Sequence, residues 1–306
     1  MPIPSAQDLD RAQREALMRA VTEAVIRRDW DEIEAMFGGL GLPIPERDYR
    51  LGRVSAATGA LSRAADDQLD ILAGLVLPPT FNLEWEQLNP WEPGRFRLFL
   101  SHAHQDRQFV GAVAQGLSTK GIHGFVAHED IDVQAEWAHV IEYALDTADA
   151  MVAFVSEHSL ASPWCNQEIG WALGRDLLVV SVALGRVPLG FTSRFQAQRT
   201  TDDPAQLAGN LWNFLLGRGE TGVTLSSSVI NFLEESVNWE DATPRSGMLS
   251  SLQWTHDTIQ QLAEAIRSSH KLTEAHRVSG RVRQVFAGFG YQPDEEVAEY
   301  LRRGGR

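Results

Sequence analysis

The stretch that decides the fold is AMVAFVSEHSLASPWCNQEIGWALGRDLLVVSVALG, residues 150–185. It begins with a continuous apolar run, passes through a segment with helical spacing, and ends in a second apolar run. Short apolar runs on either side of a helix are typical of parallel strands that are buried on both faces. The stretch therefore predicts a strand–helix–strand unit within a parallel sheet.

The same alternation continues toward both ends of the chain. Residues 95–103, RFRLFLSHA, and residues 123–131, HGFVAHEDI, are strand-like, whereas residues 106–121, 137–149 and 202–217 have helical spacing. Strands that alternate with helices in this order indicate a parallel sheet with helices on both faces. We therefore predict an α/β domain over residues 95–216.

The N-terminal region, residues 1–77, is predicted to be helical. Apolar residues recur at three- and four-residue spacing from Ser5 to about Phe37, which predicts one helix that Ser5 caps. A second helical stretch is predicted from Arg47 to about Leu77. A regulatory or assembly role is expected for this region.

Two further regions lie outside the predicted sheet domain. Residues 78–94, PPTFNLEWEQLNPWEPG, predict a semi-rigid linker whose tryptophans pack against a neighbouring domain. Residues 217–306 have helical spacing again, and Asp294 is placed to cap the last helix. The sequence leaves open whether this C-terminal region forms a small bundle or an assembly surface.

Composition excludes several classes of partner. The 306 residues carry a net charge of −14, with a sequence pI near 5.1, which disfavours binding to nucleic acid or to an anionic membrane surface. The single cysteine cannot form an intramolecular disulfide, which fits a reducing compartment. The sequence shows neither a signal peptide pattern nor an apolar run of about 20 residues. We expect a cytoplasmic protein.

Polar residues follow each of the apolar runs. They are SHAH at 101–104, HEDI at 128–131 and SEHSLASPWC at 156–165. Ligands of open parallel sheets bind beyond the carboxyl ends of the strands, so we expect these segments to converge at one edge.

Glu168 belongs to a predicted helix for which Ser162 is the N-cap and Pro163 is the first residue. The residues one helical turn away from this carboxylate are Trp164, Cys165 and Trp171. Two interpretations follow. Glu168 is either a solvated helix residue beside core tryptophans, or a carboxylate that these neighbours partly desolvate.

Other chemistry is less well supported by the residues. Cys165 is either a nucleophile activated by a histidine from these loops, or a small buried thiol that packs between strand and helix. His102 and His104 alternate after a strand and point to opposite faces, so no metal site is expected. The sequence has no glycine loop of the GxGxxG or GxxxxGKS kind, which a conventional dinucleotide or ATP site would require.

The order of these motifs resembles a bacterial TIR domain. The matching segments are FLSHA at 99–103 followed by Asp106, FVAHEDI at 125–131, Trp137, and SPWCNQE at 162–168. The resemblance covers about a third of the chain and implies a flavodoxin-like parallel sheet between helical flanks. One departure is Ala135, which stands in the loop before Trp137 where related domains often have glycine.

The resemblance also implies an activity. TIR domains of this kind cleave NAD+ between nicotinamide and ribose, without a separate cofactor, to ADP-ribose or a cyclic product. By position, Glu168 corresponds to the family's catalytic residue. The positions that the resemblance implies for substrate binding are Ser101, His102, Ala103, Trp137, Trp164 and Cys165.

In the family, activity requires self-association into oligomers or filaments, and a sensor or effector protein often supplies the trigger. Such proteins serve bacterial antiphage immunity. The alternative from a different class is a non-enzymatic adaptor that signals through TIR–TIR association. Adaptors often lack the glutamate, so the presence of Glu168 favours the enzyme. A third hypothesis is a hydrolase that depends on Cys165.

Overall fold

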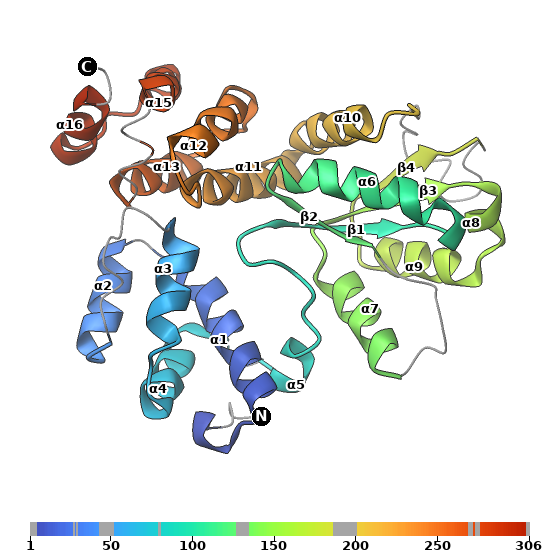
Figure 1. The fold of residues 1–306 in the computed structure, drawn as a ribbon, viewed down its shortest axis with the longest axis horizontal. Coiled ribbons are helices and arrows are strands. Elements are labelled where there is room, and N and C mark those ends of the chain that lie inside the picture. The colour runs from blue at the N-terminus through green and yellow to red at the C-terminus, as the bar shows by residue number, and fades with distance from the viewer. Residues whose placement is uncertain are drawn as a thin grey trace. The chain divides into compact units, whose positions relative to one another are not determined.

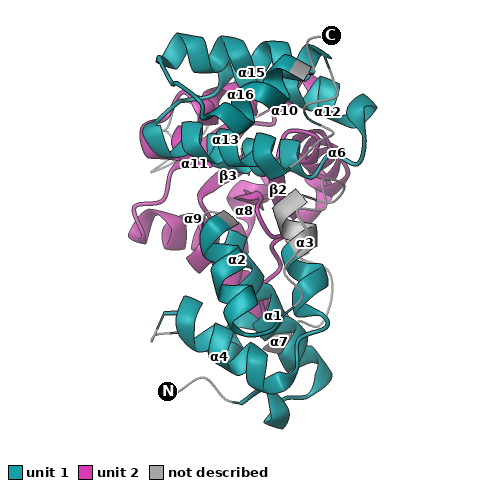
Figure 2. Ribbon diagram, turned by 90° about the vertical axis from the view of Figure 1, so that its left-hand side faces the viewer, with its two compact units in different colours: residues 1–87, 226–306 teal, residues 88–225 magenta. Residues whose placement is uncertain are grey.

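The computed structural model describes residues 5–26, 28, 30–42, 52–78, 81–126, 135–185, 201–268, 272 and 276–303. The chain divides into two compact units, which Figure 2 shows in different colours. One unit is residues 88–225. The other combines residues 1–87 with residues 226–306, so helices from both ends of the chain belong to the same unit.

The described part of residues 88–225 contains a parallel sheet of four strands. Its strands lie in the order β2 (Ile122–Val126), β1 (Phe96–Ser101), β3 (Ala150–Val155) and β4 (Val179–Ala183). Leu98 of β1 pairs with Gly124 on one side and with Ala150 on the other. Every residue of β3 is buried, as the continuous apolar run requires. The predicted parallel α/β sheet is therefore confirmed.

Helices cover both faces of this sheet (Figure 1). α6 and α10 lie on one face, and α7 and α9 lie on the other. A Cβ atom on Gly116 of α6 would lie 2.8 Å from the Cβ of Ala208 in α10, so glycine permits this close packing. The α-helices that lie wholly within the described part of this unit are α6 (Arg107–Ser118), α7 (Ala135–Thr147), α8 (Glu157–Ala161), α9 (Pro163–Gly174) and α10 (Pro204–Leu216).

The segment before β1 is anchored to the sheet domain by Trp91. This side chain is 2% exposed, and its indole N–H donates to Thr147 Oγ1 at 2.8 Å. Its ring meets the rings of His123 and Phe125 edge-on, with centroids 5.6 and 5.9 Å away. Trp91 therefore packs within the unit of residues 88–225, to which it belongs itself, and not against a neighbouring domain.

His123 gives this anchor a dependence on pH. Burial lowers the pKa of His123 from its usual value of 6.5, and the nearby Glu92 carboxylate opposes that shift. The backbone N–H of Glu92 donates to His123 Nδ1 at 2.8 Å, which requires that nitrogen to be unprotonated. As the pH falls below 6.5, the unfolded chain takes up a proton that the folded chain resists.

We therefore expect the free energy of unfolding to fall between neutral pH and about pH 5, and to fall less in His123→Gln. Denaturant titrations at several pH values measure this difference. The matched control is His139→Gln, which removes an exposed histidine of α7. Equal pH dependence in wild type and His123→Gln would contradict the assignment.

The N-terminal helices bury a separate apolar core, to which α1 contributes Leu17, Val21 and Val25. Here the predicted boundaries were wrong. Two helices replace the single one from Ser5 to Phe37, and Ser5 Oγ donates to Asp70 Oδ2 at 2.6 Å instead of capping them. The helices are α1 (Arg11–Ile26), α2 (Trp30–Gly39), α3 (Gly52–Leu61), α4 (Asp66–Val76) and α5 (Leu83–Glu86).

The C-terminal region is helical, as predicted. Its elements are α11 (Gly219–Glu234), α12 (Trp239–Ser246), the 3-10 segment η4 (Gly247–Ser251), α13 (His256–Ser268), α15 (His276–Phe289) and α16 (Glu295–Arg303). Asp294 Oδ1 accepts from the N–H of Val297 at 2.9 Å, which confirms the predicted cap. Among the described residues, no helix is both long and apolar enough to span a bilayer.

Candidate functional site

Ser101 is the last residue of β1 and lies at the carboxyl end of the sheet. β1 is an inner strand, paired with β2 on one side and β3 on the other. Ser101 pairs with Ala153 of β3, and its side chain is 1% exposed. A hydroxyl in such a position needs a hydrogen-bond partner, because an unpaired buried polar group is costly.

α9 supplies that partner. The helix begins as predicted, with Pro163 as its first residue and Ser162 Oγ accepting from the N–H of Cys165 at 3.3 Å. The buried positions of α9 are Cys165, Glu168 and Ala172, which are spaced three and four residues apart and so share one face. Glu168 lies on the face that packs against the sheet.

The two elements meet in one short hydrogen bond. Ser101 Oγ donates to Glu168 Oε2 at 2.5 Å, and the glutamate side chain is only 6% exposed. A hydrogen bond to a carboxylate is stronger than one between neutral groups, and it partly offsets the cost of burying the charge. The bond also fixes the direction in which the carboxylate faces.

We expect Ser101→Ala to lower the free energy of unfolding by about 1–3 kcal/mol, because the buried carboxylate loses a donor. Denaturant titration measures the loss, and a double-mutant cycle with Glu168→Ala, which removes the acceptor, isolates the coupling between the two side chains. Ser118→Ala is the control, since it removes an exposed hydroxyl at the end of α6. Purely additive effects of the Ser101 and Glu168 variants would count against the pair.

His102 follows Ser101 and is also buried, with 4% of its surface exposed. Its Nδ1 lies 2.9 Å from the carbonyl oxygen of Leu100. Because a carbonyl only accepts, Nδ1 carries the proton in this hydrogen bond. Ala103, next in the chain, is 2% exposed. The segment after β1 is therefore held firmly from its first residue.

A second polar contact joins the segments that follow β1 and β3, and we did not predict it. Ser156 Oγ donates to Asp106 Oδ2 at 2.6 Å. Ser156 also accepts from the N–H of Ser159, whose own Oγ accepts from the N–H of Ser156. The two serines three residues apart, directly after an apolar run, have the spacing of a reciprocal cap, but this local pattern does not reveal the contact with Asp106.

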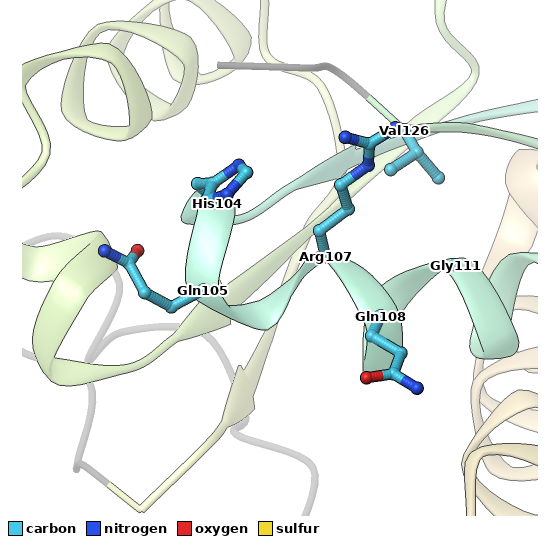
Figure 3. Close-up of a pocket in the computed structure, with 6 residues that line it drawn as sticks. All are labelled: His104, Gln105, Arg107, Gln108, Gly111 and Val126. Atoms are coloured by element: carbon cyan, nitrogen blue, oxygen red, sulfur yellow. The ribbon is translucent and has the colours of Figure 1, made fainter. Parts of the chain in front are cut away.

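An open hollow of about 810 Å³ lies beside the start of α6. Its described lining consists of His104, Gln105, Arg107, Gln108, Gly111 and Val126. In Figure 3, the side chains of His104 and Arg107 extend to the same side, and that of Arg107 reaches Val126 at the end of β2. Neither Ser101 nor Glu168 is among these lining residues, so the hollow and the buried pair are distinct features of the same edge.

The sequence profile of the TIR domain family matches residues 98–209, from the third residue of β1 into α10. This chain contains a TIR domain. No curated protein and no solved structure matches the chain. The TIR domain has the parallel sheet and the helical cover expected of a flavodoxin-like α/β fold.

Within the TIR domain, the structure contradicts the interpretation of Glu168 as a solvated helix residue beside core tryptophans. The carboxylate is not solvated, and the two tryptophans are not core residues, because Trp164 is 47% and Trp171 40% exposed. The indole N–H of Trp171 donates to Asp146 Oδ1 of α7 at 2.7 Å. The carboxylate is buried by the sheet and by Ser101, and not by the side chains of Trp164 and Trp171.

Three further residues of the sequence analysis, Cys165, Ala135 and Trp137, belong to α9 and α7. Cys165 is 1% exposed and lies on the buried face of α9, which fits the interpretation of a small thiol that packs between strand and helix. Ala135 is the first residue of α7 and so belongs to a helix, not to a loop. The backbone of Trp137 lies in the same helix, whereas its side chain and residues 128–134 lie outside the part that the structure describes.

Metal binding was not expected. Within the described ranges, no three side chains of His, Cys, Asp or Glu are grouped closely enough to hold a metal ion.

Proposed function

We propose that the TIR domain cleaves NAD+ between nicotinamide and ribose, with Glu168 as the catalytic carboxylate. The observation that carries this proposal is the hydrogen bond of 2.5 Å from Ser101 Oγ to Glu168 Oε2. It joins the end of an inner strand to the helix of the SPWCNQE motif at the edge where ligands of parallel sheets bind.

A single carboxylate is sufficient for this reaction. Hydrolysis of an ordinary glycoside needs a second carboxyl group, because the leaving oxygen must be protonated. The nicotinamide ring of NAD+ is already cationic and leaves as a neutral molecule, so no general acid is required. The negative charge of Glu168 stabilises the positive charge that develops on the ribose, and it can also accept hydrogen bonds from the ribose hydroxyls.

Ser101 has a positioning role in this mechanism. Its hydroxyl holds one carboxylate oxygen, so the charge of Glu168 faces a fixed direction before substrate arrives. Electrostatic stabilisation is most effective when the charged group does not have to reorient during the reaction. His102 and Ala103 continue the same segment, and the similarity to TIR domains supports a contact between this segment and the substrate.

The hollow beside α6 supports a place for the diphosphate of NAD+. Arg107 is permanently cationic and lines the hollow together with His104. The diphosphate is the most strongly negative part of the substrate. The buried pair and the hollow both lie at the carboxyl end of β1. Ser101 is the last residue of the strand, and His104 lines the hollow three residues later.

The similarity to TIR domains supports the biological part of the proposal. We propose that the protein works in the cytoplasm, that self-assembly into oligomers or filaments activates it, and that it serves bacterial antiphage immunity. The fate of the ribosyl cation decides the product. Attack by water gives ADP-ribose, whereas attack by an atom of the same molecule gives a cyclic product.

Mass spectrometry of the products formed from NAD+ in isotopically labelled water tests this proposal. ADP-ribose that carries one labelled oxygen identifies a hydrolase, and an unlabelled product with the mass of cyclic ADP-ribose identifies a cyclase. The fractions to compare are the monomeric and the assembled chain. Intact NAD+ in both fractions favours the non-enzymatic adaptor.

A further inference from the structure

The turn between α11 and α12 and the first residue of α12 present two large apolar side chains to solvent. Val237 is 70% and Trp239 57% exposed. We call these two residues the knob. They are not held loosely, because Asn238 Oδ1 accepts from the N–H of Asp241, and Asp241 Oδ2 accepts from the N–H of Val237. An exposed tryptophan on an ordered turn is costly in water and is typical of the centre of a protein interface.

The same unit also contains an apolar groove between η4 and α15. Its volume is about 560 Å³, and its apolar lining comes from Leu249, Trp254, Val285 and Phe289. Phe289 is 41% exposed, and Gly288 leaves the groove open because nothing lies within 4 Å of the position of a Cβ atom there. Hollows of roughly 300–1,000 Å³ hold drug-sized ligands, so an indole and an isopropyl group fit.

The residues beside the knob and those of the helix that lines the groove carry opposite charges. α15, HRVSGRVRQVFAGF, has three arginines and no acidic residue, although the whole chain has a net charge of −14. Arg277 is exposed and lies one helical turn before Arg281, which lines the groove. The knob is followed by the acidic first turn of α12, in which Glu240 is exposed.

The knob does not fill the groove of its own chain. Arg281 Nη1 donates to the carbonyl oxygen of Thr243 at 2.6 Å and to Ser246 Oγ at 2.7 Å, which places the groove at the C-terminal end of α12. The knob lies at the opposite end of that helix. Because α12 has eight residues, it separates the two by about 12 Å at 1.5 Å per residue.

We propose that the knob of one copy inserts into the groove of a second copy, with Glu240 beside Arg277. The two surfaces differ, so the contact is heterologous, and repetition of it builds a ring or an open filament. The contact lies outside the TIR domain and does not depend on the proposed enzymatic activity. It gives the C-terminal helices a definite role in assembly.

Sedimentation velocity of the purified full chain over a range of micromolar concentrations, at low and high salt, tests the proposal. Wild type is expected to self-associate, and more weakly at high salt because the ion pair is screened. Trp239→Ser in the knob and Phe289→Asp in the groove are each expected to weaken self-association by at least about 30-fold. The control is Leu75→Ser on α4, where Leu75 is 59% exposed.

Mixing the two variants identifies a heterologous contact. Trp239→Ser retains its groove and Phe289→Asp retains its knob, so an equimolar mixture is expected to form dimers that cannot extend. The second test reverses the charges, since Glu240→Arg and Arg277→Glu are each expected to weaken association, and the two changes together restore it. A wild-type chain that stays monomeric, a mixture that does not pair, or a Leu75→Ser variant that is equally impaired overturns the proposal.

Discussion

Glu168→Gln is expected to reduce the rate of nicotinamide release from NAD+ by about 100- to 1,000-fold, the usual cost of removing a group that stabilises transition-state charge. The change removes the negative charge but keeps the size of the side chain, and the amide oxygen can still accept from Ser101. The fold is therefore expected to persist. Initial rates at saturating NAD+, with fold and assembly state matched, measure the effect.

Glu220→Gln is the matched control for this experiment. It makes the same chemical change at an exposed position of α11 and is expected to leave the rate unaltered. If Glu168→Gln retains the wild-type rate, Glu168 is not the catalytic carboxylate. If Cys165→Ala is far more damaging than Glu168→Gln, the cysteine-dependent hydrolase replaces our proposal.

Phe99→Ala is expected to lower the free energy of unfolding of the TIR domain by about 3–5 kcal/mol. Phe99 is fully buried in the inner strand β1, and its ring centroid lies 5.5 Å from that of Phe125 in β2. Truncation leaves a cavity directly below the strand end that positions Ser101. Denaturant titration measures the loss.

Phe99→Leu distinguishes the cavity from any other effect of the change. Leucine keeps most of the apolar volume, so the loss is expected to stay below about 1.5 kcal/mol. Losses of equal size in the two variants would show that the cavity is not the cause.

β1, β3 and β4 were predictable because they are almost wholly buried and therefore read as largely apolar runs. The start of α9 was predictable for a local reason, since Ser162 and Pro163 have preferences that do not depend on the rest of the fold. Two other features, α12 and the break between α1 and α2, could not be predicted from the sequence pattern. α12 contains Pro244 and few apolar residues, and the apolar spacing of the N-terminal region continues across the break between α1 and α2.

The bond between Ser101 and Glu168 joins residues 67 positions apart, so no local pattern shows it. Helical spacing correctly placed Trp164, Glu168 and Trp171 near one another along α9. Helical spacing does not reveal which side of α9 faces the sheet. The exposure of Trp164, Glu168 and Trp171 could therefore not be predicted from it. The contact between Asp106 and Ser156 was missed for the same reason as the bond to Glu168.

The most direct test of the central claim is the rate at which the assembled wild-type chain releases nicotinamide from NAD+, compared with Glu168→Gln in the same assembly state. Our account predicts many turnovers for the wild type and a loss of about 100-fold or more for the variant. Equal rates for the two proteins, or no release by an assembled wild-type chain, would contradict it.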